Sequence, residues 1–145
     1  MKRAIFRIID ANFNRSREGL RVCEDVARFI LNSPKLTKEL KAIRHALSAI
    51  MREPPIDSRI LYESRDVETD VGRRSRFKSE MKRLDSIDIF YANIERVKES
   101  IRVLEEFTKL AGAKAPAKFA ALRYRVYDVE KRFNKKVSSL RDRRP

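Results

Sequence analysis

The chain has 145 residues, of which 42% are hydrophobic and 39% are charged, and its formal net charge is +14. This composition is typical of one globular domain and excludes an intrinsically disordered chain. Its single cysteine excludes a disulfide framework and a cysteine-based zinc site, and without a long apolar run or a signal-peptide pattern we expect a cytoplasmic protein with no membrane partner.

The positive charge is concentrated in residues 73–78, 82–83 and 131–144, whereas acidic and basic residues alternate elsewhere. Glutamine and tryptophan are absent while Lys, Arg and Glu are abundant, a pattern common in heat-adapted proteins with surface ion-pair networks. We therefore interpret most of the charge as a solvated surface. A basic helical nucleic-acid-binding protein stays open as an alternative.

The first predicted helix runs for about 22 residues from Ile9, because apolar or small residues recur there at steps of three and four. This stripe comprises Ile9, Phe13, Ser16, Leu20, Cys23, Ala27 and Ile30. Ser33 is expected to cap the second helix and Pro34 to be its first residue. The second stripe comprises Leu36, Leu40, Ile43, Leu47 and Ile50, before the prolines at 54–55.

A long segment without regular apolar periodicity follows, at residues 53–80. Its part 64–72, SRDVETDVG, carries two aspartates and one of the three glycines of the chain. A connection of this length in a compact domain is usually functional or disordered. We predict an ordered functional loop, with a plain linker as the alternative.

The second half of the chain repeats the first. Residues 92–106, ANIERVKESIRVLEE, resemble residues 11–25, ANFNRSREGLRVCED, and residues 123–126 resemble residues 44–47. Such a long period is typical of one supersecondary unit used twice. The third helix carries Phe90, Ile94, Val97, Ile101, Leu104, Thr108 and Ala111 and ends at Gly112; the fourth begins at Pro116 and carries Phe119, Leu122, Val126, Val129 and Phe133.

These elements predict an all-α helical bundle of two related, antiparallel helix hairpins in a single domain, 1–145. The repeat halves span about 5–52 and 86–135, joined by the loop 53–80 and followed by a basic tail, 136–145. A symmetric bundle with exposed apolar ends is also compatible with a homodimer.

Polar residues recur beside the apolar stripe. Asn12, Arg15 and Gly19 lie on one line of the first helix, and Asn93, Arg96 and Ser100 repeat that line. Under pseudo-twofold symmetry the two lines could face a shared cavity, where Arg side chains would bind phosphate bidentately. In the alternative, Asn bridges helices and each Arg pairs with a nearby Glu, at 18 or 99. Gly19 favours close approach of another helix over that of a ligand.

Further candidates lie on the second helix of each hairpin and in the loop. Arg44 and Arg123 occupy matched positions and could join the same basic pocket, and we expect a buried or ligand-adjacent role for His45, which Tyr124 replaces in the second copy. Asp66 and Asp70 offer hard oxygen ligands for Mg²⁺ bound together with phosphates, or are simply turn-forming residues. No Walker or GxGxxG motif occurs, so a nucleotide site must be built from helix and loop side chains.

The stretches that carry these residues resemble a known family: 10–22 (DANFNRSREGLRV), 64–72, 102–106 (RVLEE) and 123–124. They resemble a helical domain of thiamine biosynthesis that is often fused ahead of thiamine-phosphate synthase and is associated with hydroxymethylpyrimidine-phosphate kinase activity. The resemblance covers nearly the whole chain. It implies phosphorylation of hydroxymethylpyrimidine phosphate to its diphosphate, with ATP and Mg as cofactors.

We assign roles to the candidates on that basis. Arg15, Arg96 and Arg65 are the catalytic candidates. Arg44, Arg123, His45, Tyr124, Asn12 and Asn93 are the candidates for binding substrate and phosphate, and Asp66 and Asp70 are those for metal.

The chain ends at Pro145 with no synthase barrel, so we expect it to act alone or with a separate thiamine-phosphate synthase. The absence of a catalytic His–Asp or Cys–His arrangement also fits a domain without catalysis. A non-catalytic ligand-binding or accessory module for the synthase therefore stays open, and the nucleic-acid-binding alternative is the least favoured because no recognition-helix signature is present.

Overall fold

The computed structural model describes residues 2–72, 82–112 and 114–142. All regular elements in these residues are helical, which confirms the all-α prediction. In chain order they are α1 (Lys2–Asp25), the π-helix η1 (Val26–Ile30), α2 (Pro34–Ile50), α3 (Ser58–Ser64), α4 (Ser86–Leu110) and α5 (Pro116–Arg141).

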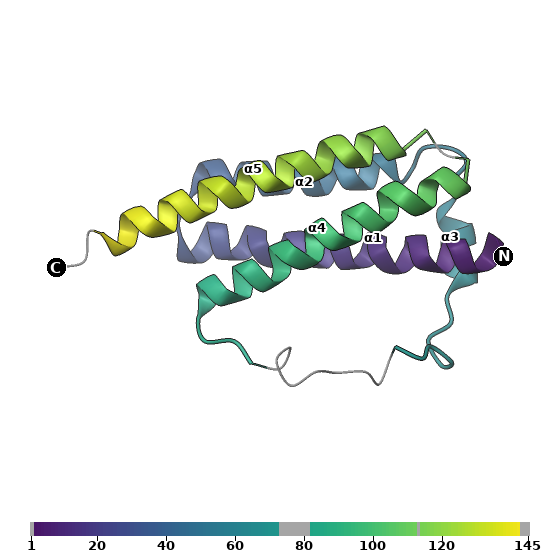
Figure 1. The fold of residues 1–145 in the computed structure, drawn as a ribbon, viewed down its shortest axis with the longest axis horizontal. Helices are drawn as coiled ribbons and strands as arrows, with labels where there is room; N and C mark the ends of the chain where they lie inside the picture. The colour runs from purple at the N-terminus through teal and green to yellow at the C-terminus, as the bar shows by residue number, and fades with distance from the viewer. Residues whose placement is uncertain (1, 73–81, 113, 143–145) are drawn as a thin grey trace.

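The four long helices form two hairpins packed side by side (Figure 1). Helix α1 lies antiparallel to α4, α2 packs on α1, α5 packs on α4, and α2 contacts α5. The chain reverses between α1 and α2 and again between α4 and α5, as predicted for two antiparallel helix hairpins. The short helix α3 packs against α1 near the N-terminus.

Both long first helices exceed the expected length of about 22 residues. Helix α1 begins at Lys2 and has 24 residues before η1 continues it, and α4 has 25 residues. The predicted start at Ile9 is wrong because the stripe continues toward the N-terminus. Ile5 and Phe6 are half-buried and pack against the core.

The predicted apolar stripes form the core. On α2, α4 and α5 every predicted stripe residue is buried except Ala111, which is half-buried. On the first stripe Phe13 is half-buried and Ile30 is 54% exposed. A π-helical turn holds more residues than an α-helical turn, so η1 rotates Ile30 away from the stripe.

The helix ends follow the predicted cap positions, with one exception. Helix α2 has Ser33 at its N-cap and Pro34 as its first residue, but the Ser33 side chain makes no cap hydrogen bond, so its predicted capping role is wrong. Gly112 has a φ of 72°, the left-handed conformation that ends α4, and Pro116 begins α5.

Two segments expected to be irregular contain helix. Helix α3 lies within the predicted loop 53–80, where the Asp57 carboxylate accepts a hydrogen bond from the Arg59 N–H at 2.8 Å and Leu61 is buried. A seven-residue helix is too short to show an apolar period in the sequence. The predicted basic tail begins inside α5, which continues to Arg141 because Val137 extends its buried face. Residues 73–80 of the predicted loop lie outside the described residues.

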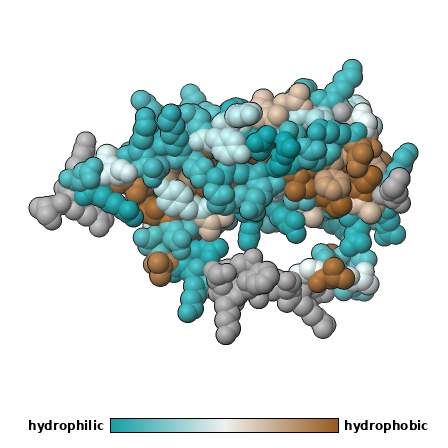
Figure 2. Space-filling model, in the orientation of Figure 1, coloured by the Kyte–Doolittle hydropathy of each residue, from teal (hydrophilic) through white to brown (hydrophobic). Residues whose placement is uncertain are grey.

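The surface agrees with the charged composition. Figure 2 shows a mostly hydrophilic face, with apolar side chains in scattered places. Among the helices of the described residues, none is long and apolar enough to cross a bilayer.

Candidate functional site

An open cleft of about 570 Å³ lies between the N-terminal half of α1 and the segment 65–70 that follows α3. We call it the α1–loop cleft. Its lining comprises Ala4, Arg7, Ile8, Asp10, Ala11, Asn12, Arg15, Arg65, Asp66, Val67 and Asp70. Five of the residues predicted from the sequence therefore line the cleft. They are Asn12 and Arg15 from α1 and Arg65, Asp66 and Asp70 from the loop, which lies about 50 positions later in the chain.

An ion pair between a buried carboxylate on α1 and an exposed arginine ties the loop to that helix. Asp10 is 5% exposed, and its carboxylate accepts hydrogen bonds from both Nε and Nη2 of Arg65, the second at 2.9 Å. These hydrogen bonds raise the pKa of the Arg65 guanidinium above its ordinary value. The same guanidinium lies over the Tyr62 ring at 4.5 Å. Arg65 is therefore held in a fixed orientation as a permanent cation.

Asn12 and Arg15 form the α1 side of the cleft. The buried Asn12 amide donates to the Ile8 carbonyl oxygen at 2.8 Å, and its Oδ1 accepts a hydrogen bond from Arg15 Nη1 at 3.4 Å. Within the described residues Arg15 forms no ion pair, so the alternative pairing with Glu18 does not occur. The exposed Arg15 side chain can therefore meet an anion in the cleft without first losing a carboxylate partner.

The two loop aspartates line the cleft and also shape its turns. The Asp66 carboxylate accepts hydrogen bonds from the backbone N–H of Thr69 at 3.0 Å and from the Thr69 hydroxyl. The hydrogen bond from the hydroxyl is the main cause of the lowered pKa of Asp66. Asp70 accepts from the Gly72 N–H at 2.9 Å. The turn-forming alternative is thus correct for both residues, and it leaves their role at a metal as a prediction.

The donor set for a metal is small. Throughout residues 2–72, 82–112 and 114–142, no three His, Cys, Asp or Glu side chains lie close enough together to hold an ion by themselves. Two carboxylates fit Mg²⁺ where phosphate oxygens complete the coordination, because Mg²⁺ usually binds to proteins through one or two carboxylates.

The sequence interpretation missed Arg7 and Asp10. Arg7 Nη1 lies 3.9 Å from Asp66 Oδ2. Arg7 precedes Arg15 by two turns (positions 7, 11 and 15), so it belongs to the same helix line. That spacing could have revealed it, but the expected helix start at Ile9 left Arg7 outside the helix.

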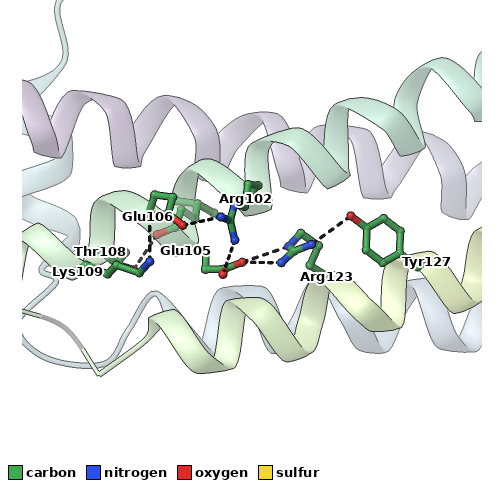
Figure 3. Close-up of polar contacts among 8 residues, drawn as sticks. Arg102, Glu105, Glu106, Thr108, Lys109, Arg123 and Tyr127 are labelled. Atoms are coloured by element: carbon green, nitrogen blue, oxygen red, sulfur yellow. Dashed lines mark hydrogen bonds and ion pairs between the residues drawn. The ribbon is translucent and has the colours of Figure 1, made fainter.

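Arg44 and Arg123 do not line this cleft. Arg44 Nε donates to the buried Glu24 carboxylate at 3.0 Å, and Arg21 contacts the same carboxylate at 3.3 Å. The second hairpin repeats this arrangement around Glu105. There Arg123 Nε donates to Glu105 Oε2 at 3.1 Å, and Arg102 Nη1 donates to Glu105 Oε1 at 2.7 Å. Figure 3 shows both arginines around this carboxylate.

Arg123 makes contacts with tyrosines that Arg44 lacks. Its Nη1 donates to the Tyr127 hydroxyl at 3.1 Å, the main cause that raises the pKa of Arg123 (Figure 3). The matched arginines are thus held by carboxylates at the hairpin interfaces. Glu106, next to Glu105 on α4, also forms an ion pair, with Arg102.

The remaining candidates also lie outside the α1–loop cleft. Asn93 donates to the Ile89 carbonyl oxygen at 2.9 Å, as Asn12 does to Ile8, and Arg96 is exposed on α4. The structure therefore brings only the first Asn–Arg line to the cleft. His45 on α2 is exposed, so the buried role considered for it is wrong. Tyr124 on α5 is exposed as well, and the role of both residues at a ligand stays a prediction.

Gly19 is explained by helix packing. A Cβ atom at this position would lie 2.7 Å from Val97 Cγ2 and 3.0 Å from the Asn93 carbonyl oxygen. The sequence preference for close helix approach over ligand approach is thus confirmed. Cys23, buried between α1 and α4, donates its S–H to the Phe90 carbonyl oxygen at 3.6 Å, and burial raises the pKa of its thiol.

Comparison with known proteins places this sequence in a family. The model of the ThiD2 family matches residues 7–132. The chain is 42% identical over 127 residues to a thiamine-phosphate synthase of Synechocystis sp., covering 88% of this chain and 35% of that protein. It is 38% identical over 141 residues to a thiamine-phosphate synthase of Rhodopirellula baltica, covering 97% and 37%.

The chain spans about a third of the length of these relatives, and no solved structure matches it. The family match includes the α1–loop cleft from Arg7 onward and both hairpins as far as the middle of α5. Because that match covers most of the chain, this protein belongs to the ThiD2 family.

Proposed function

We propose that this chain is a small-molecule kinase of thiamine biosynthesis that converts hydroxymethylpyrimidine phosphate to its diphosphate with ATP and Mg²⁺. Membership of the ThiD2 family and similarity to thiamine-phosphate synthases support the pathway. The resemblance of the DANFNRSREGLRV stretch supplies the reaction. The observation that carries the proposal is the α1–loop cleft, where three arginines lie beside two loop aspartates.

The residues of the cleft suit the demands of this reaction. A phosphate oxygen of the acceptor attacks the γ-phosphorus of ATP, the bond to the β–γ bridging oxygen breaks, and ADP leaves. The acceptor phosphate is already ionised near neutral pH, so no strong general base is needed. Positioning and neutralisation of charge on the crowded phosphates provide most of the catalysis.

Each arginine has a distinct environment for this task. Arg15 has no carboxylate partner among the described residues and is the candidate to bind the transferring group. Arg65 is oriented by the buried Asp10 and offers a fixed positive charge across the cleft. Arg7, next to Asp66, adds positive charge at the loop end of α1. Asn12, whose amide is held by Ile8, is the candidate for the edge of the pyrimidine or a phosphate oxygen.

Asp66 and Asp70 are the candidates to hold Mg²⁺ together with phosphate oxygens. The Asp66 carboxylate, whose pKa the Thr69 hydrogen bonds lower further, is ionised at neutral pH, as a metal ligand requires. When bound, the ion would neutralise charge on the nucleotide phosphates.

The test is turnover by the pure chain. We expect ³¹P NMR to show formation of the pyrimidine diphosphate and ADP from hydroxymethylpyrimidine phosphate, ATP and Mg²⁺. Omitting the metal or the acceptor should abolish ADP release. No product with Mg²⁺ or Mn²⁺ and any common nucleoside triphosphate would overturn the proposal.

A second candidate is a non-catalytic module that serves thiamine-phosphate synthase. It is favoured because the relatives are thiamine-phosphate synthases, and this chain spans about a third of their length. Calorimetry on the same preparation separates the candidates. Binding of hydroxymethylpyrimidine phosphate or of a separate synthase, without phosphoryl transfer, would support the accessory role.

A further inference from the structure

A second cleft lies at the opposite end of α1, where the chain turns from η1 into α2. We call it the turn cleft. Its volume is about 520 Å³, and its lining comprises Arg28, Asn32, Ser33, Pro34, Thr37, Lys38 and Lys41. It shares no lining residue with the α1–loop cleft, and Arg28 follows Arg15 by roughly 20 Å along the helix axis.

The turn itself is tightly bonded. Asn32 has a φ of 45°, in the left-handed region that asparagine tolerates, and the Ser33 N–H donates to the Ala27 carbonyl oxygen at 2.9 Å. The Ser33 carbonyl oxygen accepts from both the backbone N–H and the hydroxyl of Thr37, at 3.0 and 2.8 Å. The backbone groups of Ser33 are therefore satisfied within the turn.

The Ser33 hydroxyl is different. The residue is 5% exposed and lines the cleft, yet its side chain makes no cap hydrogen bond, and no other partner for it occurs among the described residues. The hydroxyl oxygen is accessible from the cleft, because no fully buried side-chain oxygen among the described residues lacks a partner. A ligand acceptor in the cleft would satisfy it.

The charge around this hydroxyl is uniformly positive. Arg28, Lys38 and Lys41 line the cleft, and no acidic residue is present in the lining. None of the three forms an ion pair within the described part of the chain; the Arg28 guanidinium lies over the Phe29 ring at 4.7 Å. The N-terminus of α2 adds first-turn N–H groups without intrahelical partners and the positive end of the helix dipole.

These cations are not a requirement of the hairpin fold. At the offset of 79 that relates α2 to α5, Lys38 corresponds to Ala117 and Lys41 to Ala120. The second hairpin therefore packs in the same way without them. Lys38 and Lys41 lie three positions apart and so share one face of α2.

We propose that the turn cleft is a separate binding site for a phosphate-bearing small anion, a phosphate ester or a diphosphate. The Ser33 hydroxyl donates to a phosphate oxygen, the first-turn N–H groups of α2 face the anion, and Arg28, Lys38 and Lys41 neutralise it. The cleft is large enough for more than one phosphate group. This site stands independently of the proposed kinase activity.

The test measures binding of inorganic pyrophosphate by calorimetry at constant ionic strength. We expect the Lys38→Ala/Lys41→Ala variant to bind it at least 10-fold more weakly than the unaltered chain. The matched control is Lys131→Ala/Lys135→Ala, which removes the same charge from exposed positions of α5 and should bind normally.

Several results would overturn the proposal. These are no pyrophosphate binding at millimolar concentration and an equal loss in the α5 control. Binding of a single-stranded oligonucleotide without binding of pyrophosphate would also overturn it, in favour of a nucleic-acid surface. Alanine at positions 38 and 41 favours helix, so misfolding does not confuse the result.

A second measurement locates the anion. We expect pyrophosphate to shift the backbone amide NMR signals of Lys35 and Leu36, in the first turn of α2, and Ser33→Ala to weaken binding by several-fold. If the shifts occur only around α1 residues 4–15, the anion binds in the α1–loop cleft and the turn cleft is not a site.

Discussion

The two hairpins share their buried polar contacts but differ in their clefts. Glu24 with Arg44 in the first hairpin and Glu105 with Arg123 in the second form equivalent ion pairs between neighbouring helices. The α1–loop cleft, in contrast, involves only α1, because α3 and the segment 65–70 have no counterpart against α4 in the described residues. The repeated Glu–Arg pairs thus serve the architecture, and the candidate site lies where the first hairpin packs against a segment that the second hairpin lacks.

The contact between the long helices α1 and α4 also differs between the two halves of the repeat. Gly19 and its counterpart Ser100 both lie in the buried interface of the long helices. Only Gly19 faces a neighbouring backbone so closely that a Cβ atom would clash. The symmetry of the sequence is therefore approximate in three dimensions, and each member of a repeated pair must be judged by its own contacts.

The largest expected effect tests whether the cleft belongs to the first half alone. Under the proposed kinase function, Arg15→Ala should lower kcat/KM by roughly 100-fold or more, because a group that stabilises transition-state charge is lost. Arg96→Ala should lower it only a few-fold, since Arg96 is exposed on α4 outside the cleft. Steady-state kinetics of both variants decide the point. Equal losses of kcat/KM in the two variants would instead support one pocket shared by the Arg15 and Arg96 helix faces.

The next prediction tests the equivalence of the ion pairs. Glu24→Ala and Glu105→Ala should each reduce the free energy of unfolding by about 3 kcal/mol, because each leaves a poorly exposed arginine without its partner. Urea denaturation measures the change. Glu106→Ala serves as the control and should alter stability little, since that carboxylate is more exposed. A large loss in only one hairpin would show that the two pairs are not equivalent.

A smaller effect is expected at the helix crossing. Gly19→Ala should destabilise the protein by about 1–3 kcal/mol, despite the better helix propensity of alanine, because the new Cβ contacts Val97 and the Asn93 carbonyl oxygen. Ser100→Ala should cost about 1 kcal/mol or less, through loss of its hydrogen bond to the Arg96 carbonyl oxygen. Thermal denaturation compares the two. A stabilising Gly19→Ala would contradict the close contact of α1 with α4.

The smallest effect concerns the segment that only the first half has. Hydrogen bonds from Thr69 lower the pKa of Asp66 below its ordinary 3.8, so their contribution is present above that value and is lost as pH falls through the lower folded pKa. An NMR titration of the Asp66 carboxyl carbon should show a midpoint below 3.8 that Thr69→Val raises. A midpoint at or above 3.8 in the unaltered chain would exclude the turn.

The sequence by itself determined the helices, their buried faces and the duplication. These features depend on local spacing, since a residue on an amphipathic helix repeats its environment every three or four positions. That spacing predicted Leu20, Leu47, Val97 and Val126 in the core. It failed at Ile30, where a π turn changes the period, and at α3, which is too short for a period to appear.

Only the tertiary structure decided which polar residues meet. Arg65 reaches Asp10 across 55 positions, and the spacing along either segment contains no information about that contact. The same is true of Arg44, which local pattern placed with Arg15 but which folding places against Glu24. Helical period determines which face a side chain occupies. The packing of distant segments determines what that face contacts, and so which copy of a repeated motif lines a cleft.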